Sequence, residues 1–288
     1  MRPAIQSNSV LFPYDRWRRD LATLARGYRS NEPFPHLHLR RFLEPEAAAR
    51  VAGEFPRAGD TRWIEYRHFN ERKLGKSRRS EFPRLLGELV DELNSARFTR
   101  WLSDLTGIEG LLADPDLEGG GLHQTERGGF LNVHADFTHH HRRPGWRRRI
   151  NLILYLNEPW PADWGGALEL WDREMAQVVA KVPPRLNHAV IFSTNETSYH
   201  GYPEPLTCPE SERRKSLALY YYTDEPEDRY RARSTDYRAR PQDRGLKRPL
   251  IWLDKKAVAV YSATKKHLGL SDELTGRILG LFRRDDRK

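Results

Sequence analysis

The sequence predicts a mainly β fold with flanking helices (α+β), for two reasons. From about residue 116 to 224, short apolar or alternating runs follow one another and are separated by Gly, Pro and Asn. Many short strands between turns are typical of a β-sandwich or barrel. Before that stretch, apolar side chains recur at helical spacing instead. We therefore expect a β-rich core at 116–224, a supporting region of helices and one strand at 1–115, and a charged segment with a C-terminal helix at 225–288.

The N-terminal region carries helical patterns and one strand pattern. Residues 14–27 have apolar positions at helical spacing, and Gly27 is the expected stop. Residues 33–43 start with two prolines and then alternate Leu with polar residues, as a strand does. A helix is expected to follow, with Pro45 in its first turn. One or two further amphipathic helices are expected over 83–104.

The C-terminal region differs in composition from the core. Residues 224–249 are highly charged and poor in aliphatic side chains, which predicts an exposed segment. Residues 271–282 begin with Ser271, a good helix N-cap, and continue with apolar residues at helical spacing. They predict a short terminal helix.

Composition limits the class of protein. There is no apolar run long enough for a membrane span and no apolar stretch typical of a signal peptide at the N-terminus. Cys208 is the single cysteine, so an intramolecular disulfide and a Cys-rich metal site are excluded. These observations predict a cytoplasmic protein. The net charge is +9, but the excess is spread along the chain and no nucleic-acid reader motif accompanies it, which weighs against nucleic-acid binding.

A candidate metal site comes from three residues. His134 and Asp136 form a His-x-Asp pair, and His200 lies 64 residues after Asp136. Two imidazoles and one carboxylate can occupy one face of an octahedron and leave the opposite face open, as in non-haem Fe(II) oxygenases. The pair alone is a weak signal, because a chain with 11 His contains such pairs by chance.

A candidate anion site follows in the sequence. Arg214 lies fourteen residues after His200 and opens the strand pattern RKSLALYYYT. An arginine fork binds a carboxylate through two hydrogen bonds and stays charged when buried. Side chains 214, 216 and 218 would share one face of the strand. The alternative is a solvated strand end, which applies to one or two of Arg213, Arg214 and Lys215.

The order of these motifs resembles a known family. It is similar to the prolyl-4-hydroxylase-like branch of the Fe(II)/2-oxoglutarate oxygenase superfamily, and most similar to bacterial relatives of the yeast ribosomal-protein prolyl hydroxylase. The similar stretch runs from about Gly119 to Thr223. The resemblance implies a double-stranded β-helix (jelly roll) core braced by the N-terminal helices.

The resemblance also implies roles for particular residues. His134, Asp136 and His200 match the iron ligands and are the catalytic centre. Gln124 stands ten residues before His134, where relatives often have a tyrosine near the co-substrate, and this is a departure from the pattern. The residues expected to bind 2-oxoglutarate are Arg214, Ser216, Tyr155 and Gln124.

The activity implied is that of a 2-oxoglutarate-dependent dioxygenase that uses Fe(II), 2-oxoglutarate and O₂ and releases succinate and CO₂. Related halogenases lack the carboxylate ligand, so the retained Asp136 implies hydroxylation. The implied substrate is a prolyl or other amino-acid-like group in a protein, peptide or small molecule.

Two alternatives stay open because of the segment that follows the metal motif. His139, His140 and His141 fit a second metal site or a substrate-binding edge, but a solvated loop cluster is favoured. The arginine cluster at 142–149 fits an anionic substrate, although a charged hairpin rim is slightly favoured. The rival functions are an oxygenase acting on an anionic glycan, nucleotide or nucleic acid, and a non-catalytic jelly-roll binding protein.

Overall fold

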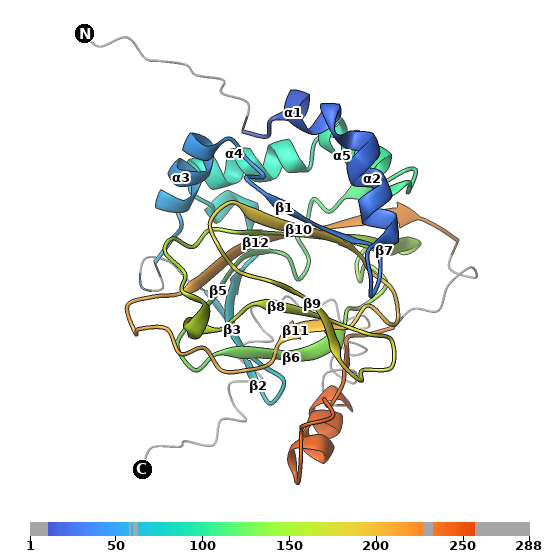
Figure 1. Ribbon diagram of the computed structural model, residues 1–288. Coiled ribbons are helices and arrows are strands. Elements are labelled where there is room, and N and C mark those ends of the chain that lie inside the picture. The colour runs from blue at the N-terminus through green and yellow to red at the C-terminus, as the bar shows by residue number, and fades with distance from the viewer. Residues whose placement is uncertain (1–10, 58, 60–62, 227–232, 257–288) are drawn as a thin grey trace.

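A computed structural model describes residues 11–57, 59, 63–226 and 233–256. Its strands form one sheet that folds back on itself, in the order β1-β10-β7-β12-β5-β3-β6-β11-β8-β9. Helices α1 to α5 cover the layer that contains β1, β10, β7 and β12, while β6, β8, β9 and β11 lie in the opposite layer (Figure 1). The mainly antiparallel jelly roll expected from the resemblance is confirmed.

The helices and strands have the following bounds. The helices are α1 (Tyr14–Arg19), α2 (Leu21–Ser30), α3 (Pro45–Gly53), α4 (Arg84–Leu93) and α5 (Ala96–Thr106), and a further helix spans 247–256. The strands are β1 (His36–Arg40), β2 (Ile64–His68), β3 (Glu71–Lys76), β4 (Leu112–Ala113), β5 (Gly121–Thr125), β6 (Phe130–Ala135), β7 (Trp146–Tyr155), β8 (Leu168–Trp171), β9 (Val178–Val182), β10 (His188–Ser193), β11 (His200–Tyr202), β12 (Arg214–Asp224) and β13 (Asp236–Tyr237).

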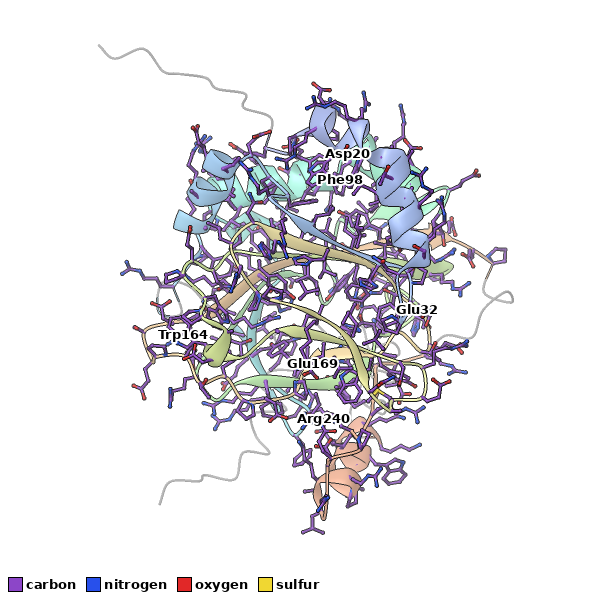
Figure 2. The ribbon with its side chains drawn as sticks, viewed as in Figure 1. Asp20, Glu32, Phe98, Trp164, Glu169 and Arg240 are labelled. Carbon is purple, nitrogen blue, oxygen red and sulfur yellow. The ribbon has the colours of Figure 1, made fainter. Side chains whose placement is uncertain are left out.

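The main core lies between the helices and one face of the sheet. Apolar side chains of α4 and α5, such as Leu89 and Phe98, pack against alternate residues of β7 and β12, such as Leu152 and Leu217 (Figure 2 labels Phe98). Full burial of one such side chain stabilises the fold by about 1.5–3 kcal/mol. Because this face is taken up by the helices, the intervening residues of each strand point to the other face, between the two sheet layers.

Local signals explain why the helical pattern at 83–104 forms two helices. Ser95 caps α5, since its side chain accepts a hydrogen bond from the backbone N–H of Phe98. The helix ends at Gly107, which adopts φ 76°, a left-handed conformation that glycine adopts readily. The stop expected at Gly27 was wrong: α2 continues to Ser30, and the break falls at Asp20.

Two parts of the chain differ from the sequence-based expectation. The charged hairpin β2–β3 was not predicted, and β3 pairs with both β5 and β6 of the core. Residues 224–249 were expected to be exposed, yet Tyr237 and Arg240 are buried (Figure 2 labels Arg240). The helix predicted at 271–282 lies outside the described residues. In the part of the chain that is described, no helix has the length and apolar character needed to cross a membrane.

Candidate active site

Two neighbouring strands bring the three candidate metal ligands together. β6 and β11 run antiparallel, with His134 directly opposite His200, and Asp136 follows β6 immediately. The Nε2 atoms of His134 and His200 lie 3.5 Å and 3.4 Å from the carboxylate of Asp136. One ligand atom from each residue falls within 4.8 Å of the others. The three side chains therefore present a compact set of donor atoms.

Backbone hydrogen bonds orient both imidazoles. Nδ1 of His134 lies 2.9 Å from the carbonyl oxygen of Asn132, and Nδ1 of His200 lies 2.9 Å from that of Ser198. A carbonyl oxygen only accepts, so Nδ1 carries the proton and the lone pair is on Nε2. Burial lowers the pKa of His200 to about 4, although Asp136 opposes the shift. A neutral imidazole with Nε2 facing the other ligands is the form that binds a metal.

Asp136 is held in place by two buried donors. Its Oδ2 accepts a hydrogen bond of 3.0 Å from Nη2 of Arg148 and one of 2.6 Å from Nδ2 of Asn151. Burial alone would raise the pKa of Asp136, but Arg148 and the two imidazoles outweigh it and hold the pKa well below its usual value. The carboxylate is therefore charged. Two imidazole nitrogens and one carboxylate oxygen fit Fe(II).

Arg148 is buried, so the interpretation of its position as a charged rim was wrong. Its guanidinium lies 3.4 Å from the ring centroid of Tyr220 and 4.5 Å from that of Phe137. Its Nε donates to Oδ1 of Asn151 at 2.8 Å. Nη1 is buried and has no hydrogen-bond partner among the described residues. Arg148 is thus a fixed support of Asp136 that keeps one donor unused.

Three other arginines of this cluster pair with carboxylates. Arg147 and Arg149 lie 3.1 Å and 2.6 Å from Glu225. Arg143 lies 3.0 Å from Asp116. These pairs leave less positive charge for an anionic substrate than the sequence indicates.

The histidine cluster forms a buried network. His140 is buried, with Nε2 3.2 Å from Oδ1 of Asp114. Its Nδ1 lies 3.1 Å from the backbone nitrogen of Arg142 and so accepts that N–H. Both oxygens of Asp114 already accept backbone N–H groups. Asp114, Asp116 and His140 are close enough to hold an ion, but these engaged atoms favour a structural role: they anchor the loop between Asp136 and β7. The prediction of a solvated loop cluster was therefore wrong for His140.

Arg214 is buried on the face of the sheet between the two layers. Its Nε donates to the carbonyl oxygen of Gly166 at 2.7 Å, and its Nη2 donates to the hydroxyl of Tyr155 at 3.2 Å. The guanidinium lies near two aromatic rings, 4.9 Å from the ring centroid of Tyr155 and 4.0 Å from that of Tyr202. Within the described part of the chain, no carboxylate forms an ion pair with it. A buried cation without a counter-ion is a ready site for an anion.

Strand register shows which neighbours share this face. Arg214 pairs with Thr125, and Ser216 pairs with both His123 and Tyr155. Directly paired residues of antiparallel strands point to the same side. Arg213 and Lys215, by contrast, line an outer surface pocket next to α3. The register thus brings Arg214, Ser216 and Tyr155 together.

The same register places Gln124 on the opposite face of the sheet from Arg214, Ser216 and Tyr155. Gln124 pairs with Lys215, and its neighbour Leu122 packs in the helix-covered core. Successive residues of a strand point to opposite faces. Gln124 therefore faces the helices, and His123 and Thr125 face Arg214 and Ser216. The register therefore does not place Gln124 with the other residues expected to bind 2-oxoglutarate.

A C-terminal tyrosine packs against the metal cluster, which sequence patterns did not reveal. Tyr237 of β13 pairs with His134, and the two ring centroids are 5.3 Å apart. The helix at 247–256, at the bottom of Figure 1, is joined to the β2–β3 hairpin through Asp254. His68 bridges Asp254 and Glu71, with distances of 2.7 Å and 2.9 Å. The sequence showed only that residues 224–249 are highly charged, and this predicted an exposed segment instead of one packed against the metal cluster.

This bridge predicts a pH dependence of stability. Burial lowers the pKa of His68, but the hydrogen bonds to Asp254 and Glu71 outweigh it and raise the pKa to about 9. A raised pKa stabilises the fold fully below the unfolded value of about 6.5, and the gain is lost as the pH rises through about 9. We expect His68→Gln to cost on the order of 2 kcal/mol at pH 6 and almost nothing above pH 9. Denaturant titrations at both pH values measure this; equal losses at the two would contradict it.

Comparison with known proteins agrees with this geometry. A family model of the 2OG-Fe(II) oxygenase superfamily matches residues 120–222. This segment is therefore similar to the oxygenase domain of that superfamily. Its range contains all three candidate metal ligands and Arg214, and the superfamily's enzymes use Fe(II), 2-oxoglutarate and O₂.

Proteins to which this chain is similar include prolyl hydroxylases. The chain is 35% identical over 79 residues to prolyl 3-hydroxylase OGFOD1 of Mus musculus, which covers 26% of this chain and only 14% of that protein. A prolyl hydroxylase of Trichoplax adhaerens, solved with a peptide of hypoxia inducible factor, has a TM-score of 0.50 at 16% identity and covers 73% of this chain and 91% of that one. A Pseudomonas putida prolyl-4-hydroxylase has a TM-score of 0.49 at 18% identity, with 69% and 98% covered. At such identities the structural similarity concerns the fold.

Proposed function

We propose that this chain is an Fe(II)- and 2-oxoglutarate-dependent hydroxylase in which His134, Asp136 and His200 hold the iron. One observation carries the proposal. A set of two imidazoles and a charged carboxylate lies in the same jelly roll as Arg214, a buried cation that lacks a carboxylate partner among the described residues. A non-catalytic binding protein has no need of both features. The sequence match to the oxygenase superfamily supports the same function.

Each residue has a separate task in this function. Arg214 and Tyr155 bind the distal carboxylate of 2-oxoglutarate, and Ser216 lies beside them. Nη2 of Arg214 donates to the oxygen of Tyr155, which leaves the hydroxyl hydrogen for a ligand; burial raises the pKa of Tyr155, so that hydrogen is retained. The bound iron, with 2-oxoglutarate and O₂, supplies the oxidation of a substrate C–H bond to C–OH as 2-oxoglutarate becomes succinate and CO₂.

The substrate that we propose is a prolyl or similar amino-acid residue of a protein or peptide. Relatives named as prolyl hydroxylases support it. A nucleic-acid substrate is less favoured, because Arg143, Arg147 and Arg149 are paired with carboxylates. We further propose residues 116–224 as the catalytic core, with 1–115 and 225–288 as supporting regions, and the cytoplasm as its compartment, supported by the single cysteine.

Succinate release tests the proposed function. The full chain with Fe(II), 2-oxoglutarate, O₂ and a panel of proline-containing peptides should form succinate, and mass spectrometry should find one added oxygen on a peptide. His134→Ala should lower the rate at least about a hundredfold, more than is typical for loss of a residue that only orients a ligand. His188→Ala is the matched control, because His188 lies on β10 and bonds to His38. Equal succinate formation by the wild type and His134→Ala would refute the function.

A further inference from the structure

A buried pair of hydroxyl groups lies beside Arg214 and has no role in the function proposed so far. Tyr202 ends β11, two residues after His200, and is buried. Its hydroxyl oxygen lies 2.9 Å from Oγ1 of Thr125. Thr125 is the cross-strand partner of Arg214, and the ring of Tyr202 lies 4.0 Å from the guanidinium. The two hydroxyl groups therefore lie next to the guanidinium of Arg214. Tyr202 also lies on β11, the strand that carries the candidate metal ligand His200.

A count of hydrogens shows that this pair has an unused donor. Two hydroxyl groups carry two hydrogens, and the hydrogen bond between them uses one. Neither hydroxyl has a second partner among the described residues. Buried donors are nearly always satisfied by protein, water or ligand. One hydroxyl hydrogen of Tyr202 or Thr125 thus has no acceptor, and it lies next to Arg214, which has no carboxylate partner among the described residues.

A single carboxylate group of a ligand can pair with Arg214 and also accept the spare hydroxyl hydrogen. A carboxylate offers about four acceptor positions, and a guanidinium fork uses two of them. The remaining positions can accept the spare hydroxyl hydrogen. Hydrogen bonds to Gly166 and Tyr155 hold the guanidinium next to the rings of Tyr155 and Tyr202, so the fork and the hydroxyl pair are arranged before a ligand binds.

We propose that Tyr202 and Thr125 complete, with Arg214, the binding site for the distal carboxylate of 2-oxoglutarate. Tyr202 reaches this site from β11, the strand that carries His200, and Thr125 reaches it from β5. This inference rests on the proposed function.

Calorimetric titration of 2-oxoglutarate into the full chain loaded with Ni(II) tests it. Tyr202→Phe keeps the ring over Arg214 and removes the hydroxyl, and Thr125→Val removes the other hydroxyl at nearly constant shape. Each should raise the Kd for 2-oxoglutarate about tenfold to a hundredfold, the usual effect of a hydrogen bond to a charged group. The double variant should bind 2-oxoglutarate at least as weakly as the weaker of the two single variants, because only the double variant removes both hydroxyl hydrogens. The affinity for Ni(II) should stay unchanged.

A matched control and two opposing outcomes complete the test. Tyr221→Phe also removes one buried tyrosine hydroxyl, but that hydroxyl bonds to the carbonyl of Leu93 on the helix-covered face, so the Kd should not change. Wild-type Kd values in Tyr202→Phe and Thr125→Val would overturn the inference, as would a loss of affinity in Gln124→Met in their place. If the wild-type Ni(II) protein itself failed to bind 2-oxoglutarate, the proposed function would fall and the inference with it.

Discussion

Replacing Arg148 by methionine is expected to lower the free energy of unfolding of the metal-free protein by about 3–5 kcal/mol. Arg148 is buried, the side chain of Asp136 is only 11% exposed, and the two form an ion pair of 3.0 Å. Methionine fills much of the space but leaves the carboxylate charged and unpaired away from water, which is the costly way to break such a pair. Loss of this support should also weaken metal binding by about ten- to a hundredfold.

Arg149→Met is the matched control for this variant. Arg149 is the next residue along β7, and its side chain and that of its partner Glu225 are 28% and 20% exposed, so the loss should stay below about 1 kcal/mol. The pKa of Asp136 lies below its usual value in the folded protein, so its pairing stabilises the fold above about pH 4 and the gain is lost as the pH falls further. Denaturant titrations should therefore show the Arg148→Met deficit at pH 7 and a smaller one in acid. Equal losses in the two variants at pH 7 would show that Asp136 does not depend on Arg148.

The sequence carries enough information to place the metal cluster but not its supports. His134, Asp136 and His200 are found because their chemical types and order are unusual together, and the strand pairing of His134 with His200 brings them close. Arg148 could not be singled out, because three consecutive arginines look alike in a sequence. Only the alternation of β7 turns Arg148 inward while Arg147 and Arg149 reach Glu225.

A shift of one residue separates Gln124 from the face of the sheet that carries Arg214 and Ser216. Counting back from His134 finds the right strand, but the face of a side chain depends on whether its position is odd or even in the register. The pairing of Ser216 with His123 and of Lys215 with Gln124 is a property of two strands far apart in the sequence. Spacing to a neighbouring motif cannot determine it, because the turn at 126–129 between β5 and β6 is free to vary in length.

The buried C-terminal segment was missed for a different reason. A high density of charge predicts exposure when each charge needs water. Here Arg240 pairs with Asp243, and Asp254 pairs with His68 of the β2–β3 hairpin. Charges that satisfy one another allow Tyr237 between them to lie against His134. Composition alone does not reveal such pairing.

Replacing Arg214 by methionine is expected to have the opposite effect on stability from Arg148→Met. No carboxylate of the described residues pairs with Arg214, so its burial is compensated only by Gly166, Tyr155 and the flanking rings. An apolar side chain of similar length removes that cost, and such replacements are often neutral or stabilising. We therefore expect the ligand-free protein to unfold at the same temperature or a higher one.

Binding of 2-oxoglutarate should be lost in the same variant. The Kd for the metal-loaded protein should rise at least about a hundredfold, because a charged fork to a carboxylate is removed. Ligand at a hundred times its Kd stabilises the wild type by about 2.7 kcal/mol, and most of this gain should vanish in Arg214→Met. Arg213→Met is the control, since Arg213 pairs with Glu126 near the surface and should change neither property much. If the ligand-free Arg214→Met protein instead lost several kcal/mol, Arg214 would be a structural cation like Arg148, and the anion site would have to lie elsewhere. Arg148 is paired with a carboxylate and Arg214 is not, so methionine at the two positions should change the stability in opposite directions. Only Arg214, which lacks a carboxylate partner among the described residues, fits an anion-binding site.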